Sequence, residues 1–102
     1  MRIQWSRLAE RQLKEIFDYY SREATPRIAE IIVNDLINKV SVLMQNPLAG
    51  MREELLRHYQ EEYRYLVVRN YKIIYWKSKE TIIVATVFDC RQNPKKIKQL
   101  KS

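Results

Sequence analysis

The chain has 102 residues, of which 46% are hydrophobic and 30% charged, and its formal net charge is +7. This composition excludes extensive intrinsic disorder and predicts one domain over residues 1–102 with a modest core. No apolar run is long enough to cross a bilayer, and the first ten residues lack the apolar segment of a signal peptide, so we expect a cytoplasmic protein without a membrane partner.

The chain opens with a short extended segment followed by a helix. Residues 2–5 (RIQW) alternate in polarity, which places Ile3 and Trp5 on one side of the segment. Ser6 is a typical N-cap residue, and apolar side chains then recur at helical spacing over residues 7–20. We therefore predict a short strand and then an amphipathic helix.

A second helix is predicted over residues 26–45. Thr25 and Pro26 are of the types preferred at the N-cap and at the first helical position. Apolar residues then recur every three or four positions until Asn46-Pro47. Because only about four residues, 21–24, separate the two helices, we predict an antiparallel helical hairpin.

The sequence of the second half of the chain predicts a β-sheet. Residues 46–50 (NPLAG) indicate a loop, and residues 51–62 are ambiguous between acid-rich turns and a short strand near 54–56. Three β-rich segments follow, at residues 63–68, 71–76 and 81–88. We predict an α+β fold in which the helical hairpin packs on one face of a C-terminal antiparallel β-meander, and the opposite face stays open.

Cations lie on or beside the predicted strands, where they are expected to converge: Arg64, Arg69, Lys72 and Arg91. Convergent cations bind phosphate or carboxylate groups, but cations of this kind equally keep a sheet edge soluble. We expect Asp89 to pair with Arg91 and to orient it. A nuclease without metal would also need a general base, and His58, in the acid-rich connection, is more typical of a surface residue.

The last residues, 92–102, form a basic tail without an acidic residue. Such a tail is either a frayed terminus or a binding segment for a polyanionic partner, which would be nucleic acid or an acidic protein segment. Cys90 is the only cysteine and His58 the only histidine, which excludes an internal disulfide and the common zinc sites. We expect no metal and no cofactor, and we expect Cys90 to be partly buried and inert.

Sequence motifs in a fixed order carry a resemblance to a known superfamily: LAERQLKEIFDYY, NPLAG, YRYLVVRNYKIIY and TIIVATVFDCRQNPKKI. Together they resemble the RelE/ParE superfamily of bacterial toxins from type II toxin-antitoxin modules. The resemblance covers nearly the whole chain. It implies a small cytoplasmic toxin that is wrapped and neutralised by a cognate antitoxin. Because the antitoxin commonly represses the shared operon, contact with operator DNA would be only indirect, through the antitoxin.

Two branches of this superfamily differ in their target. RelE-like members cut messenger RNA in the ribosomal A site with lysines and arginines on the sheet, whereas ParE-like members poison DNA gyrase. The resemblance places RelE-like arginines at Lys72 and Arg91. However, Tyr65 and Val67 stand where those enzymes have lysines, and no tyrosine or histidine follows Arg91.

These departures favour a ParE-like toxin that is not an enzyme and that acts on DNA gyrase. The alternative is a metal-independent, RelE-like endoribonuclease that acts on ribosome-bound mRNA, in which Arg64, Lys72 and Arg91 would be catalytic. A third hypothesis is a degenerate interaction module that has lost toxicity. The residues predicted to bind the target or the antitoxin are Arg64, Arg69, Tyr71, Lys72, Arg91, Lys95 and Lys96.

Overall fold

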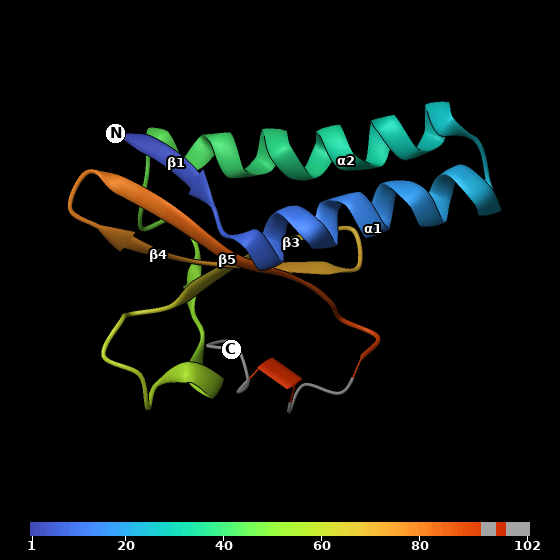
Figure 1. Ribbon diagram of the computed structural model, residues 1–102. Helices are drawn as coiled ribbons and strands as arrows, with labels where there is room; N and C mark the ends of the chain where they lie inside the picture. The colour runs from blue at the N-terminus through green and yellow to red at the C-terminus, as the bar shows by residue number, and fades with distance from the viewer. Residues whose placement is uncertain (93–95, 98–102) are drawn as a thin grey trace.

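The computed structural model describes residues 1–92 and 96–97 and contains a five-stranded sheet with two helices on one face (Figure 1). The strand order is β1-β5-β4-β3-β2. The elements are β1 (Arg2–Trp5), α1 (Arg7–Glu23), α2 (Pro26–Ser41), β2 (Met51–Arg52), β3 (Arg64–Val68), β4 (Tyr71–Ser78) and β5 (Thr81–Asp89), with short 3-10 helices η1 (Val42–Met44) and η2 (Glu54–Leu56). The predicted α+β fold is confirmed.

Helix α1 begins at the predicted cap. The Ser6 Oγ accepts a hydrogen bond from the Ala9 N–H at 3.0 Å, and Ala9 and Ile16 are buried against the sheet. The helix continues to Glu23, three residues past the prediction, because the last turn needs no apolar residue to remain helical. The connection to α2 is therefore only Ala24-Thr25, and the two helices run side by side in opposite directions (Figure 1).

Helix α2 also begins where predicted. The Thr25 Oγ1 accepts a hydrogen bond from the Ile28 N–H at 3.1 Å, and Pro26 occupies the first helical position. Its buried stripe consists of Ala29, Ile32, Leu36 and Val40. The α-helix ends at Ser41, earlier than predicted, and the apolar spacing continues in η1, where Leu43 is fully buried.

The three long strands form the predicted antiparallel meander. Arg69-Asn70 joins β3 to β4, and Lys79-Glu80 joins β4 to β5. Arg69 and Lys79 have φ values of 56° and 53°, in the left-handed region that usually favours glycine. Strand β1 adds to β5 in parallel and pairs with it from Thr81 to Val84, so the start of the chain covers the first part of the outer edge of β5.

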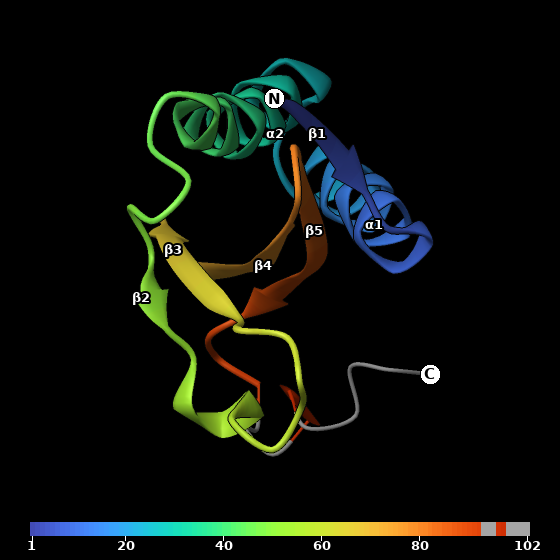
Figure 2. The ribbon, with the colours of Figure 1, turned by 90° about the vertical axis from the view of Figure 1, so that its left-hand side faces the viewer.

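The second face of the sheet, away from the helices, is not open as predicted. The segment 53–63 lies below the sheet in Figure 2 and, together with Ile97, belongs to the apolar cluster on this face. Leu56 and Tyr63 from this segment pack against Ile74 and Phe88 of the sheet. The segment is anchored because strand β2 pairs with β3 and the Glu53 N–H donates to the Tyr63 carbonyl at 2.8 Å.

Of the two alternatives left open for residues 51–62, a short strand near 54–56 is excluded, because residues 54–56 form η2 and the strand in this region is Met51–Arg52. Two residues are too few for a period-2 pattern to reveal a strand. Cys90 is exposed rather than partly buried. Among the described residues, no helix is both long and apolar enough to cross a membrane.

Candidate functional site

The predicted site cations do not gather at one point. Arg64 lies opposite Tyr75 in the β3–β4 register, on the face covered by the helices, whereas Lys72 lies opposite Val67 on the second face. Arg69 lies in the turn between these strands, and Arg91 follows the end of β5. Because successive side chains of a strand point to opposite faces, the register separates Arg64 from Lys72. The expected convergence is therefore wrong.

Each of these four cations forms an ion pair with its own carboxylate group, at 3.0 Å or less. The pairs are Arg64 with Glu62, Arg69 with Asp35, Lys72 with Glu53, and Arg91 with Asp89. A phosphate group that approached any of these cations would meet a carboxylate already bound to it. The charges compensate one another in pairs and do not form a phosphate-binding cluster.

Arg64 holds the loop that precedes β2. Its Nη1 donates to the Gly50 carbonyl at 2.8 Å, and the Tyr75 hydroxyl accepts from the Gly50 N–H at 2.9 Å and donates to the Pro47 carbonyl at 2.9 Å. A Cβ at Gly50 would lie 2.7 Å from the Tyr65 carbonyl oxygen and from the Tyr75 hydroxyl. The loop therefore requires glycine here, and Arg64 has a structural role in fixing it.

Lys72 is largely enclosed on the second face. Its Nζ lies 2.7 Å from the Glu53 Oε2 and 4.2 Å from the centre of the Tyr65 ring. The side chains of Lys72 and Glu53 are 21% and 4% exposed. Beside them Val67 is 55% exposed, so the outer part of this face presents apolar rather than charged surface.

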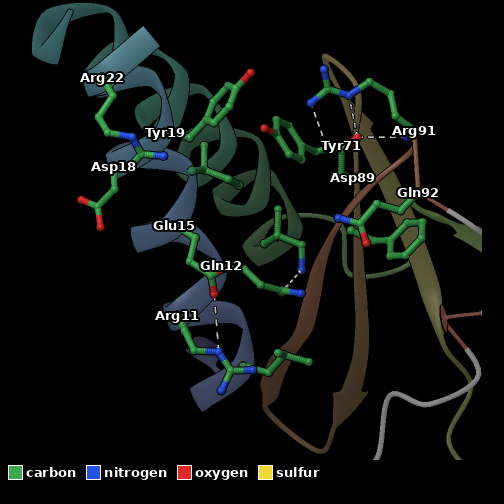
Figure 3. Close-up of a pocket in the computed structure, with 14 residues that line it drawn as sticks. Arg11, Gln12, Glu15, Asp18, Tyr19, Arg22, Tyr71, Asp89, Arg91 and Gln92 are labelled. Carbon is green, nitrogen blue, oxygen red and sulfur yellow. Dashed lines mark hydrogen bonds and ion pairs between the residues drawn. The ribbon is translucent and has the colours of Figure 1, made fainter.

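A groove of about 670 Å³ lies between α1 and the end of β5 (Figure 3). Side chains of α1 line one wall and residues at the ends of β4 and β5 line the other: Arg11, Gln12, Glu15, Asp18, Tyr19 and Arg22 face Tyr71, Asp89, Arg91 and Gln92. These walls carry both positively and negatively charged side chains. This composition suits a polar, extended peptide better than an apolar small molecule.

The Asp89–Arg91 pair forms one end of this groove. Arg91 donates through Nε and Nη2 to the two Asp89 oxygens, at 3.0 Å and 2.7 Å, which confirms the expected pairing. The guanidinium lowers the pKa of Asp89, and the carboxylate in turn raises the pKa of Arg91. Both groups are therefore charged at neutral pH.

The floor of the groove contains part of the outer edge of β5. Strand β1 ends at Trp5, so β5 has no strand partner on this side beyond Val84. The Gln12 Oε1 accepts from the Val87 N–H at 2.7 Å, which shows that this edge of Val87 points toward α1 and away from β4. The Val87 carbonyl lies on the same edge, and Val87 is only 3% exposed, so α1 covers this part of the strand edge.

Tyr63 and Tyr71 are poor candidates for a general base. Burial raises the pKa of Tyr63 to about 12, with a smaller contribution from the Glu61 carboxylate. Burial and a hydrogen bond with Tyr20 also raise the pKa of Tyr71. Both hydroxyls stay protonated near neutral pH. The His58 ring packs against the Tyr59 ring at a tilt of 37°, with ring centroids 4.3 Å apart, in the segment that covers the second face.

Of the two tail lysines predicted to bind a partner, Lys96 is exposed and Lys95 lies outside the described residues. In the described parts of the chain, no cluster of three or more His, Cys, Asp or Glu side chains could hold a metal ion.

Sequence reasoning missed the residues that neutralise or organise the site: Asp35, Glu53 and Gln12. Glu53 lies 19 residues from Lys72, and Asp35 lies 34 residues from Arg69. Gln12 lies 75 residues from the Val87 N–H that it contacts. No local spacing connects such positions, so only the fold brings them together.

The family model described as "ParE toxin of type II toxin-antitoxin system, parDE" matches residues 3–94. The chain belongs to this ParE toxin family. The solved structure described as "Chromosomal ParDE TA system from P. aeruginosa" has the same fold, with a TM-score of 0.73, over 87% of this chain and 95% of that chain. The two sequences are 21% identical. No curated protein sequence matches this chain.

Membership of the ParE toxin family agrees with the ParE-like branch favoured by the sequence. In this ParE family toxin, the cations that could have formed a nuclease site on the sheet are separated by the β3–β4 register and neutralised in pairs. A groove between α1 and β5 is one of the hollows on the described surface.

Proposed function

We propose that this ParE family toxin inhibits growth by poisoning DNA gyrase in the cytoplasm and that a cognate antitoxin neutralises it. The family match over residues 3–94 carries the proposal. The paired cations support it, because a ribonuclease needs unneutralised cations to stabilise the charge that develops on the scissile phosphate. Operator DNA is contacted only through the antitoxin.

The groove between α1 and β5 is the proposed antitoxin site. Tyr71 and Arg91, two of the predicted binding residues, line it, together with charged side chains of both signs on α1. An acidic, extended antitoxin segment complements a toxin with a net charge of +7, which also speeds association.

Induction of the chain in growing cells, with and without the product of the neighbouring small reading frame, tests the proposal. The expected result is growth arrest with the chain alone, recovery when the partner is present, and no cleavage of translated mRNA by primer extension. Cleavage within codons would favour the ribosome-dependent nuclease instead. Normal growth with abundant folded protein would favour a non-toxic interaction module.

A further inference from the structure

The side chain of Gln12 is fixed in one orientation where α1 meets the edge of β5 (Figure 3). Its Oε1 accepts from the Val87 N–H at 2.7 Å and from the Thr86 hydroxyl at 2.9 Å. Because a main-chain N–H can only donate, the Gln12 atom that faces it must be the amide oxygen. The two donors occupy both lone pairs of this oxygen, so Gln12 has no acceptor left for a ligand.

The amide nitrogen of Gln12 is left with two unused N–H donors. Gln12 lines the groove, and none of the described residues accepts a hydrogen bond from its Nε2. Over the same residues, the only buried side-chain polar atom without a partner is the Ser21 Oγ, so the Gln12 Nε2 is accessible. It can therefore donate to a carbonyl or carboxylate oxygen of a ligand in the groove.

The acidic side chains that α1 contributes to the groove are already paired. Each lies within reach of a cation one helical turn earlier: Glu15 with Arg11 at 3.6 Å, and Asp18 with Lys14 at 3.9 Å. Arg22 lines the same wall and forms no ion pair within the part of the chain that the structure describes. Arg22 and the Gln12 amide thus offer unpaired donors, which favour a ligand rich in oxygen acceptors.

We propose that Gln12 and Arg22 are specificity-determining residues for an extended acidic segment of the antitoxin, an inference that rests on the proposed neutralisation by an antitoxin. The Gln12 amide donates to a main-chain carbonyl of that segment, and Arg22 pairs with an Asp or Glu carboxylate. The two residues lie ten positions apart on α1, which is about 15 Å along the helix axis. An extended segment that runs along α1 rises about 3.3 Å per residue, so the carboxylate follows or precedes that carbonyl by about four or five residues.

The first test compares Gln12→Glu with Gln92→Glu. Glutamate at position 12 keeps oxygens for the Val87 N–H and the Thr86 hydroxyl, but it replaces the two donors with a charged acceptor. Gln92 is exposed and lines the same groove, so the control adds the same charge there and repels an acidic segment in the same general way.

Isothermal titration calorimetry with the purified product of the neighbouring small reading frame measures the affinity of each variant. Gln12→Glu should bind about tenfold more weakly than Gln92→Glu, because a hydrogen bond is replaced by repulsion between two acceptors. Its melting temperature should equal that of wild type. Equal affinity of the two variants would overturn the contact with Gln12.

Thr86→Val separates partner binding from a purely structural role of Gln12. This variant removes one of the two donors to the Gln12 Oε1, and the Val87 N–H still orients the amide. It should lower the melting temperature but bind the antitoxin as wild type does. If it weakens binding as much as Gln12→Glu does, Gln12 acts only by holding α1 to β5, and the proposed contact is wrong.

The contact with Arg22 is tested by comparing Arg22→Gln with Arg7→Gln. Arg7 is exposed on the same helix and does not line the groove, so both variants lose one charge from α1. Arg22→Gln should bind the antitoxin about fivefold more weakly than the control. Failure of the wild-type chain to bind would overturn the proposed neutralisation together with this inference. Binding by wild type, with Gln12→Glu and Arg22→Gln equal to their controls, would overturn this inference alone.

Discussion

The two faces of the sheet are buried in different ways. The first face is covered by two regular helices, whose caps and apolar stripes are visible in the sequence, and its core includes Leu36, Val40 and Ile73. The second face is covered by the irregular segment 53–63, which packs through Leu56 and Tyr63 and has one buried ion pair beneath it. The comparison shows that the two covers bury opposite faces of the sheet, and that the irregular cover also supplies Glu53 and Glu62, which pair with Lys72 and Arg64.

The largest expected effect on stability comes from removing one core side chain on each face of the sheet. Leu36→Ala, in the fully buried centre of α2, should lower the free energy of unfolding by about 2 to 5 kcal/mol. Leu56→Ala should cost less, about 2 kcal/mol, because the irregular segment around it can collapse into the space more easily. Urea unfolding of both variants measures the difference. A larger loss for Leu56→Ala would show that the second face carries the main core.

A smaller effect is expected where the loop before β2 is attached to the first face. Tyr75→Phe removes two hydrogen bonds to main-chain groups of Pro47 and Gly50, at a cost of about 1 to 3 kcal/mol. The matched control is Tyr65→Phe, since the Tyr65 hydroxyl donates to the Met51 sulfur, at 3.8 Å, and not to a main-chain group of the described residues. Thermal unfolding should show a clear drop for Tyr75→Phe alone. Equal drops would mean that the hydroxyl of Tyr75 does not hold the loop.

The Asp89–Arg91 pair should contribute a modest, pH-dependent stability. Because Arg91 lowers the pKa of Asp89 in the folded state, the pair stabilises the fold at neutral pH, and this contribution is lost as the pH falls below about 4. Wild type should therefore exceed Asp89→Asn in stability at pH 7, and the gap should narrow in acid. Urea unfolding of both proteins from pH 7 to pH 2.5 measures this difference in stability. A gap that is constant with pH would exclude this charge effect.

The smallest effect on stability is expected for Arg91→Ala, because the Arg91 side chain is 62% exposed. Its effect on antitoxin binding should be much larger, since it removes a cation from the groove between α1 and β5, the proposed antitoxin site. Recovery of growth by the co-expressed antitoxin should weaken, while the melting temperature of the toxin changes little. Lys77→Ala, which removes a similar charge outside the groove, is the control. Full neutralisation of folded Arg91→Ala would remove this residue from the antitoxin site.

The fold could be predicted largely because its signals are local. Ser6 and Thr25 begin the helices through caps to residues three positions away, and alternation over five or more residues marks each long strand. The predictions of element bounds failed in segments where such local sequence patterns end or are too short. Helix α1 outlasts its apolar pattern, and the two-residue β2 has no pattern to recognise.

The site was harder to predict because it depends on register and on distant partners. The alternation of side chains along β3 correctly placed Arg64 and Val67 on opposite faces of the sheet. The face on which Lys72 lies follows only from the β3–β4 register, in which Lys72 is opposite Val67. The carboxylates that neutralise Lys72 and Arg69 lie on other elements, in segments that read as ordinary solvated surface. The Asp89–Arg91 pair was predictable because its members are two residues apart.

The central claim, that this ParE family toxin poisons DNA gyrase, is tested most directly with purified components. The toxin is incubated with gyrase, ATP and plasmid DNA, the enzyme is then denatured and digested, and linear plasmid is measured. The account predicts that linear DNA accumulates with increasing toxin and disappears when the cognate antitoxin is added first. Normal supercoiling without linear DNA, at toxin in molar excess over gyrase and with toxin that arrests growth in cells, would contradict it.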